Sequence, residues 1–184
     1  GIMAALYERE RSGKGQVVDA AIVDGATSLM SFFFGVRHLP HLSTERGKGM
    51  LGGAAHFYRC FTCADGKEIS LGAIEPQFYA EMLQKLGLEN DPEFARQMDK
   101  SAWPNLKKRM REIIAGKTRD EWNAIFEMSD VCYAPVLTMS EAAEHPHNIA
   151  RNAFLDIDGL KQPAPAPRFS RTVPATPTPG AHPG

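Results

Sequence analysis

The fold is decided by one stretch, Gly72-Ala73-Ile74-Glu75-Pro76-Gln77-Phe78-Tyr79. The apolar run before it, residues 69–73, predicts a short strand. Pro76 suits the first turn of a helix, because its φ is already fixed and its missing N–H would be unpaired there. Glu75 is therefore expected at a helix N-terminus, where the dipole and the free amides favour a carboxylate. That position suits chemistry as well as an ordinary helix cap, and the spacing alone favours the cap.

The segments around this stretch predict a small α+β unit. Two strands, Phe57–Thr62 and Glu68–Ala73, should form a hairpin around Asp65-Gly66, because this dipeptide is a strong turn signal. A capping box, Thr118 to Glu121, predicts the start of a helix. Further elements are expected over 76–86 (helix), from Ser101 (helix), over 131–137 (strand) and over 140–144 (helix).

The first forty residues predict a different kind of structure. Gln16–Ala21 is expected to be a short buried strand and Asp24–His38 a helix, a pair that is typical of a parallel α/β sheet. The tail from Gln162 is proline-rich and should lack regular structure. The predicted class is α/β, with the domains 1–40 (end of a large α/β domain), 41–54 (linker), 55–137 (small α+β domain) and 138–184 (linker and proline-rich returning arm).

Composition excludes several function classes. The chain has 184 residues, 43% of them hydrophobic, and a net charge of −1. The charge argues against nucleic acid or an anionic membrane surface as a partner. Three cysteines favour a reducing, cytoplasmic setting over a disulfide scaffold. Cys60 and Cys63 form a CxxC, but they lie in a predicted strand without a second pair, so no metal site is expected.

Segments along nearly the whole chain resemble, in order, the α-methylacyl-CoA racemases of the family III CoA-transferase (CaiB/BaiF-like) superfamily. These segments are Ser12–Ala21, Val23-Asp24-Gly25, Arg46-Gly47 with Met50-Leu51, Gly72–Tyr79, Met82-Leu83, Leu86-Gly87-Leu88, Ser129-Asp130 with Cys132, Pro135-Val136-Leu137, Pro146-His147-Asn148, Arg151-Asn152 and Pro165–Arg171. Two positions depart from the pattern: Gly52 stands where the family usually has aspartate, and His56 where it usually has proline.

The resemblance implies a fold and a place for this chain within it. The family has a Rossmann-like large domain split in sequence, a small inserted domain, and two subunits interlocked as a homodimer. The chain would carry the small domain and the edge of the large one. An apolar helical stripe at Ile2, Met3, Leu6 and Tyr7 has no N-cap before it, which also favours a C-terminal fragment. Residues 2–6 and 24–36 should then expose apolar side chains.

The resemblance also implies a reaction. The family moves the α-proton of a 2-methylacyl thioester with a His and an Asp, and a Glu hydrogen-bonds the far nitrogen of that His. Glu75 matches the Glu and is the catalytic assignment in this chain; the His and Asp are expected upstream of Gly1, so the chain alone should be inactive. Tyr58, Ile74, Met50 and Leu51 match positions near the acyl pocket. CoA is part of the substrate, and no separate cofactor, metal, nucleic acid or membrane partner is implied.

Two other functions stay open from the sequence. A CoA-transferase of the same superfamily would need a carboxylate nucleophile to carry the acyl group, and that residue would also lie upstream. The Glu75-Pro76-Gln77 signature favours the racemase. A binding or assembly module without chemistry is the remaining alternative.

Overall fold

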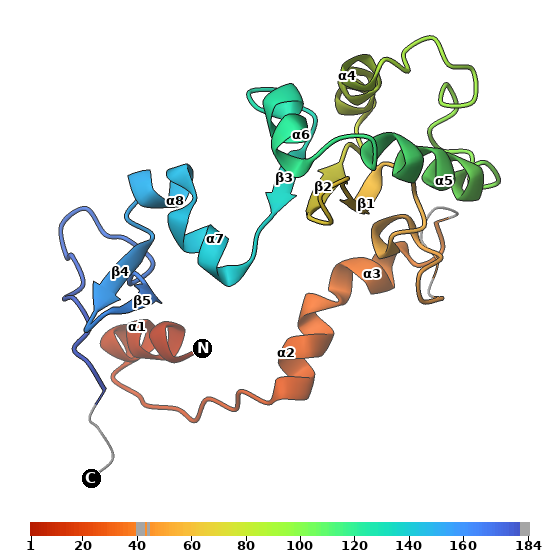
Figure 1. The fold of residues 1–184 in the computed structure, drawn as a ribbon. Coiled ribbons are helices and arrows are strands. Elements are labelled where there is room, and N and C mark those ends of the chain that lie inside the picture. Colours follow the sequence, from red (N-terminus) through yellow and green to blue (C-terminus); the bar gives the residue numbers. More distant parts are fainter. Residues whose placement is uncertain (40–42, 44, 181–184) are drawn as a thin grey trace.

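The computed structural model describes residues 1–39, 43 and 45–180, and their elements are shown in Figure 1. The helices are α1 (Ile2–Ser12), α2 (Ile22–Leu29), α3 (Ser31–Val36), η1 (Met50–Gly52), α4 (Pro76–Leu86), α5 (Trp103–Ile114), α6 (Arg119–Phe126), α7 (Met139–Glu144) and α8 (Pro146–Ala150). The strands are β1 (Tyr58–Thr62), β2 (Glu68–Gly72), β3 (Tyr133–Val136), β4 (Phe154–Ile157) and β5 (Leu160–Pro163).

The predicted hairpin is confirmed and forms the centre of an antiparallel sheet of order β1-β2-β3. Tyr58 pairs with Gly72, and on the other edge of β2 Leu71 pairs with Tyr133. At the turn, Gly66 has a φ of 77°, a left-handed conformation that glycine adopts without strain. This register places Gly72, the last residue of β2, between Tyr58 on β1 and Cys132, the residue just before β3.

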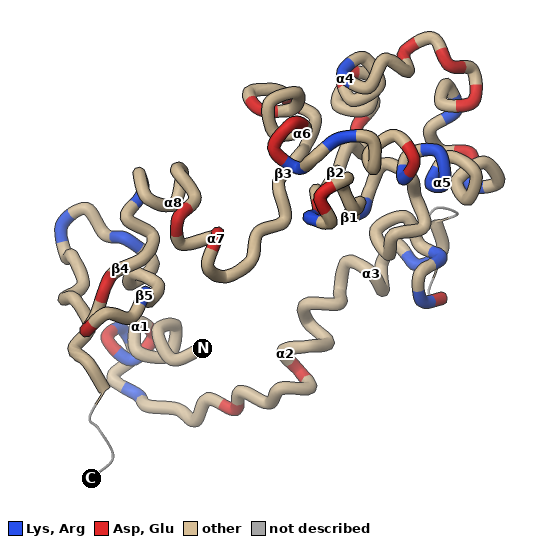
Figure 2. Tube along the Cα trace, viewed as in Figure 1, with Lys and Arg blue, Asp and Glu red and all other residues tan. Residues whose placement is uncertain are grey.

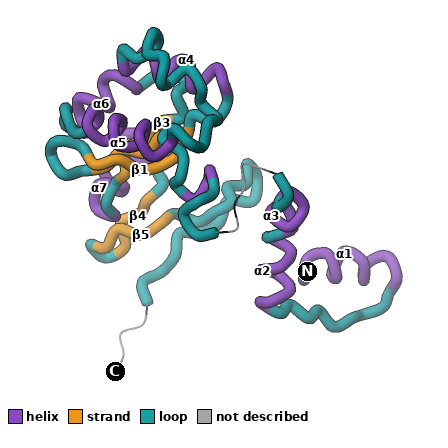
Figure 3. The backbone as a smooth tube through the Cα atoms, turned by 90° about the vertical axis from the view of Figure 1, so that its right-hand side faces the viewer, coloured by secondary structure: helices purple, strands orange, loops and turns teal. Residues whose placement is uncertain are grey.

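The core of this unit is drawn from residues between Ala55 and Val131. Figure 3 shows α4, α5 and α6 gathered around the sheet. Two tryptophans on these helices are buried, and each satisfies its indole N–H: Trp103 Nε1 donates to Gln97 O at 2.8 Å, and Trp122 Nε1 donates to Ile114 O at 2.8 Å. These bonds tie the irregular segments to the helices that they connect.

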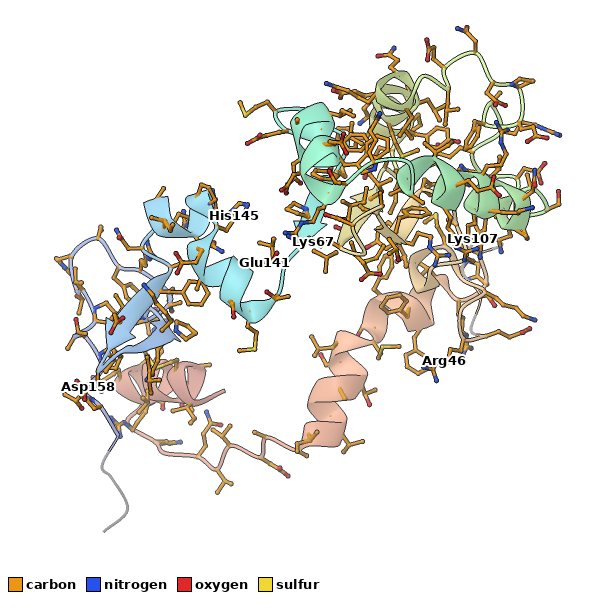
Figure 4. The ribbon with its side chains drawn as sticks, in the orientation of Figure 1. Arg46, Lys67, Lys107, Glu141, His145 and Asp158 are labelled. Carbon is orange, nitrogen blue, oxygen red and sulfur yellow. The ribbon has the colours of Figure 1, made fainter. Side chains whose placement is uncertain are left out.

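A buried ion pair joins this unit to the arm that follows β3. Arg119, the first residue of α6, is buried, and its Nη2 lies 2.6 Å from Glu141 Oε1 on α7. The Lys67 ammonium lies 3.2 Å from the same carboxylate, as Figure 4 shows for the labelled pair. The other Glu141 oxygen accepts from Thr138 N at 2.9 Å, closing a capping box like the predicted one at Thr118. Glu141 therefore caps α7 and ties it to Arg119 on α6 and to Lys67 in the turn before β2.

The strand expected over Gln16–Ala21 is wrong. The segment is irregular, and Val17 is 93% exposed. A strand needs a partner to be stable, and no strand in the described part of the chain pairs with it. The helix expected over Asp24–His38 is two short helices, α2 and α3, which meet at Met30.

Apolar side chains on α1 to α3 face solvent, as the sequence predicted. Ile22 is 90%, Leu29 84% and Phe32 61% exposed. Figure 3 shows α1 and α2 standing away from the three-stranded sheet, which explains this exposure. These exposed apolar side chains come from three successive helices, and large apolar patches are rare on soluble monomers.

The purified 184-residue chain is therefore expected to bind the dye 1-anilinonaphthalene-8-sulfonate strongly and to self-associate. Replacing Ile22 and Leu29 by serine should reduce both, because these two side chains are among the most exposed apolar groups. Dye fluorescence and light scattering measure the two effects. A monodisperse monomer that does not increase the fluorescence of the dye would contradict this expectation.

The tail is more ordered than the sequence predicted. Strands β4 and β5 form a second antiparallel hairpin, in which Phe154 pairs with Pro163, so the expectation of no regular structure from Gln162 is wrong for Gln162 and Pro163, which belong to β5. Asp158 and Gly159 both have positive φ at its turn, and Asp156 Oδ1 accepts from Gly159 N at 2.8 Å. The described residues from 164 to 180 have no helix or strand. No described helix is long and apolar enough to cross a bilayer.

Candidate active site at the junction of β2 and α4

The junction between β2 and α4 places Glu75 as the sequence predicted. Ala73 is buried at the end of β2, and its N–H donates to Phe57 O at 3.1 Å. Glu75 occupies the N-cap position with extended backbone, and α4 begins at Pro76. The Glu75 carbonyl accepts from Tyr79 N at 3.0 Å, which is the first helical bond. The backbone of Glu75 is thus part of the helix while its side chain is exposed.

The Glu75 carboxylate does not cap the helix, so the interpretation that the spacing alone favoured is wrong. Its side chain makes no cap hydrogen bond. Pro76 at the first helical position lacks an N–H, but the amides of Gln77 and Phe78, which an N-cap side chain would bind, are present and Glu75 does not bind them. The carboxylate is therefore available to a group that docks at this end of α4.

Gln97 fixes the backbone immediately before Glu75. Its Nε2 donates to Ala73 O at 3.0 Å and to Ile74 O at 2.8 Å. The backbone carbonyl of Gln97 accepts a hydrogen bond from the indole N–H of the buried Trp103 on α5, so Gln97 is itself attached to the core. The sequence analysis missed Gln97, because it lies in an irregular segment, and no pattern marks a residue whose partners lie more than twenty positions away.

Two further groups surround the end of β2. A Cβ at Gly72 would lie 3.7 Å from the Tyr58 ring and 3.7 Å from the Cys132 Cβ, so both residues lie beside this end of β2. The Cys132 carbonyl accepts from Gly72 N at 3.0 Å. Burial raises the pKa of the Cys132 thiol, and the negative charges of Glu75 and Asp130 raise it further. Glu75 therefore lies close to a thiol that is kept protonated.

The predicted acyl-pocket residues are divided between two places. Tyr58, Ile74 and Met50 are half-buried and pack against the core. Leu51 is exposed and lines a cavity of about 500 Å³ with Met30, Phe33, Arg37, Ser43, Glu45, Arg46, Gly47, Gly49 and Gly52. Glu75, Tyr58, Ile74 and Met50 are not among the lining residues of this cavity.

His56 is buried in the core behind the junction. Its Nε2 lies 2.8 Å from the Tyr79 hydroxyl, which in turn donates to Phe94 O at 2.9 Å. Nε2 must therefore carry the proton and donate, and Nδ1 has no partner among the described residues. Burial lowers the pKa of His56 to about 4. A neutral histidine without exposed surface cannot serve as a base for substrate, so His56 is structural.

In the described part of the chain, no hydrogen bond or ring contact joins His38, His145 or His147 to Glu75. His38 and His147 are exposed and His145 is half-exposed, whereas His41 and His182 lie outside the described residues. No cluster of three or more potential metal ligands occurs among the residues that the structure places. The junction thus offers one free carboxylate on a rigid support, which can accept a hydrogen bond from, and orient, another group.

Comparison with known proteins places this arrangement in a family. The model of CoA-transferase family III matches residues 1–183. Alpha-methylacyl-CoA racemase from Mus musculus is 45% identical, and that from Homo sapiens 42% identical, each over 97% of this chain and 46% of the relative. A crystal structure of a CaiB/BaiF family protein from Brucella suis aligns with a TM-score of 0.71 and 20% identity over 97% of this chain and 48% of that one.

The chain therefore spans about half the length of the curated relatives that it matches. The likeness to the Brucella suis structure, at low sequence identity, shows the fold. The match of the family model over almost all residues shows the family as well. The chain belongs to CoA-transferase family III.

Proposed function

We propose that the protein that carries this chain interconverts the (2R) and (2S) forms of 2-methylacyl-CoA thioesters. The observation that carries the proposal is the free carboxylate of Glu75, held at the start of α4 within the segment that resembles the racemases. The racemase names of the mouse and human relatives support it. We expect a homodimer, as the resemblance implies.

The chemistry needs one acid/base group on each face of the α-carbon. Each group must have a pKa near the working pH, and the thioester carries the charge of an enolate-like intermediate. Glu75 cannot do this alone. In the proposal it accepts a hydrogen bond from the distal N–H of a histidine, which fixes the tautomer and raises the basicity of the ring. Gln97 holds the backbone beside it, so the carboxylate stays in one place.

The acyl chain would lie against Tyr58, Ile74 and Met50. These side chains are half-buried and pack against the core, and Ile74 directly precedes Glu75. Leu51 would contact the acyl chain only from the neighbouring cavity. Pockets for apolar ligands are built in this way, from apolar walls and a few placed polar groups.

The test is α-proton exchange in the full-length protein. In deuterium oxide, (2S)-2-methylacyl-CoA should gain deuterium at the α-carbon and lose its configuration, and mass spectrometry with chiral separation measures both. The same reaction is run with an added carboxylic acid as a possible CoA acceptor. The 184-residue chain alone is expected to give no exchange above background, because only one of the three required groups is assigned in it.

Each result decides between the candidate functions. Exchange with inversion in the full-length protein supports the racemase. CoA transfer to the added acid without α-proton exchange would indicate a CoA-transferase instead of a racemase. If neither exchange nor transfer is detected, a binding module is favoured. Exchange by the 184-residue chain alone would show that the assignment of the missing groups is wrong.

A further inference from the structure

Three cations meet between β1 and α5, on the face of β1 opposite Tyr58. Successive side chains of a strand point to opposite faces, so Arg59 shares its face with Phe57 and Phe61. That face is covered by α5, since the Phe57 ring lies 5.9 Å from the Trp103 ring. Lys107 and Arg111 follow Trp103 at intervals of four residues, so they lie one and two turns further along α5, beside its buried stripe of Leu106, Met110 and Ile114. Figure 2 shows basic residues along α5, and Figure 4 labels Lys107 on this helix.

Arg59 is held in place before any ligand arrives. Its guanidinium carbon lies 5.5 Å from the centre of the Phe61 ring. Its Nη1 donates to Gly53 O at 3.4 Å and its Nε to Cys60 O at 3.3 Å. Arg59 Nη2 has no hydrogen-bond partner among the described residues, so it remains available to a ligand.

These three cations differ from their neighbours on the same helix. Lys108 lies 3.9 Å from Glu112, and Arg109 lies 2.5 Å from Asp91 and 2.7 Å from Glu93. Within the described ranges, no carboxylate forms an ion pair with Arg59, Lys107 or Arg111.

The charges of the three groups act on one another. Burial lowers the pKa of Lys107, and the charges of Arg59 and Arg111 lower it further. Burial and then the charge of Arg111 lower the pKa of Arg59. Arg59 and Lys107 are half-buried and Arg111 is exposed. Neighbouring like charges without a counter-ion destabilise each other, and a bound anion would remove this repulsion.

We propose that Arg59, Lys107 and Arg111 form a binding site for a phosphate-bearing anion. A single carboxylate would leave most of the positive charge uncompensated, whereas a phosphate or diphosphate carries several negative charges close together. Guanidinium groups match phosphate oxygens with two parallel hydrogen bonds, and lysine adds a compact charge. The anion is either a free polyphosphate or the phosphate part of a larger ligand such as CoA.

The test is protection of Lys107 from acetylation in the full-length protein. Pyrophosphate is the first probe and CoA the second, and mass spectrometry reads the modification of Lys107 and of Lys108 in the same sample. Pyrophosphate should slow acetylation of Lys107 several-fold and leave Lys108 unchanged, since Lys108 belongs to an ion pair on another side of the helix. In the variant Arg111→Gln the concentration needed for protection should rise about tenfold, the effect of one lost charge-assisted contact.

The matched control is Lys108→Gln, which removes the same charge from the same helix. It should leave the protection of Lys107 unchanged, which separates a site from the net charge of the surface. Protection by CoA at lower concentration than pyrophosphate would assign the site to the phosphates of CoA, and protection by pyrophosphate alone would assign it to a free polyphosphate. Equal slowing of Lys107 and Lys108, or no slowing of either, overturns the proposal.

Discussion

Replacing Glu75 by glutamine in the full-length protein should lower kcat for racemisation by roughly 10²-fold, the lower end of what a positioned acid/base group contributes. The fold should persist, since the amide has the same size as the carboxylate and the side chain is exposed without a cap hydrogen bond. KM should change little, because in the proposal the carboxylate contacts the histidine and not the thioester.

The pH profile separates this effect from a structural one. Without its anionic partner the histidine loses basicity, so the limb of the kcat profile that reports its deprotonation should move to lower pH. Glu89→Gln is the matched control, because Glu89 is also exposed and lies just after α4. An unchanged kcat together with a lowered melting temperature would make Glu75 a purely structural residue.

The second large effect is expected from His56, whose burial makes the small domain sensitive to acid. Its pKa is about 4 in the folded protein and 6.5 when exposed. Between these values the unfolded chain binds a proton that the folded protein excludes, so stability falls as pH falls. The contribution of neutral His56 to the free energy of unfolding is fully present above pH 6.5. It is lost as the pH falls to about 4, and the total loss is about 3 kcal/mol.

Hydrogen exchange on peptides that contain Phe57, Tyr79 and Phe94 measures this loss, after correction for the intrinsic effect of pH on exchange. His56→Gln keeps a donor for the Tyr79 hydroxyl but cannot titrate, so its protection should depend much less on pH over this window. His147→Gln, at an exposed position, should behave like the parent. Parallel pH curves for the parent and His56→Gln would show that the buried imidazole does not control this stability.

Elements with local signals were predictable, and elements that depend on distant partners were not. Pro76 and Asp65-Gly66 fixed the start of α4 and the first hairpin, because each acts through its own backbone. The segment Gln16–Ala21 has the composition of a strand but no partner in the described chain. The hairpin of β4 and β5 was missed although Asp158-Gly159 carries the same turn signal, because the prolines that follow dominated the interpretation.

In the candidate site, too, the features set by neighbouring residues were predictable and those that depend on tertiary contacts were not. The position of Glu75 at the helix start follows from two adjacent residues, so the sequence located it. That its carboxylate makes no cap bond depends on side-chain geometry, and sequence spacing does not reveal it. Gln97 and Cys132 come to the junction from the segments before α5 and β3. Contacts of that kind arise from tertiary packing, which no local pattern encodes.

The double role of Glu141 constrains how this protein can diverge. The Glu141 carboxylate closes the first turn of α7 and also pairs with the buried Arg119. A substitution at either 119 or 141 alone therefore disturbs the attachment of the arm that follows β3. Glutamine can serve equally well at the third position of a capping box, but it cannot balance a buried guanidinium. Substitutions at 119 and 141 are therefore expected to occur as a pair during evolution, with glutamine at 141 where the arginine has been lost.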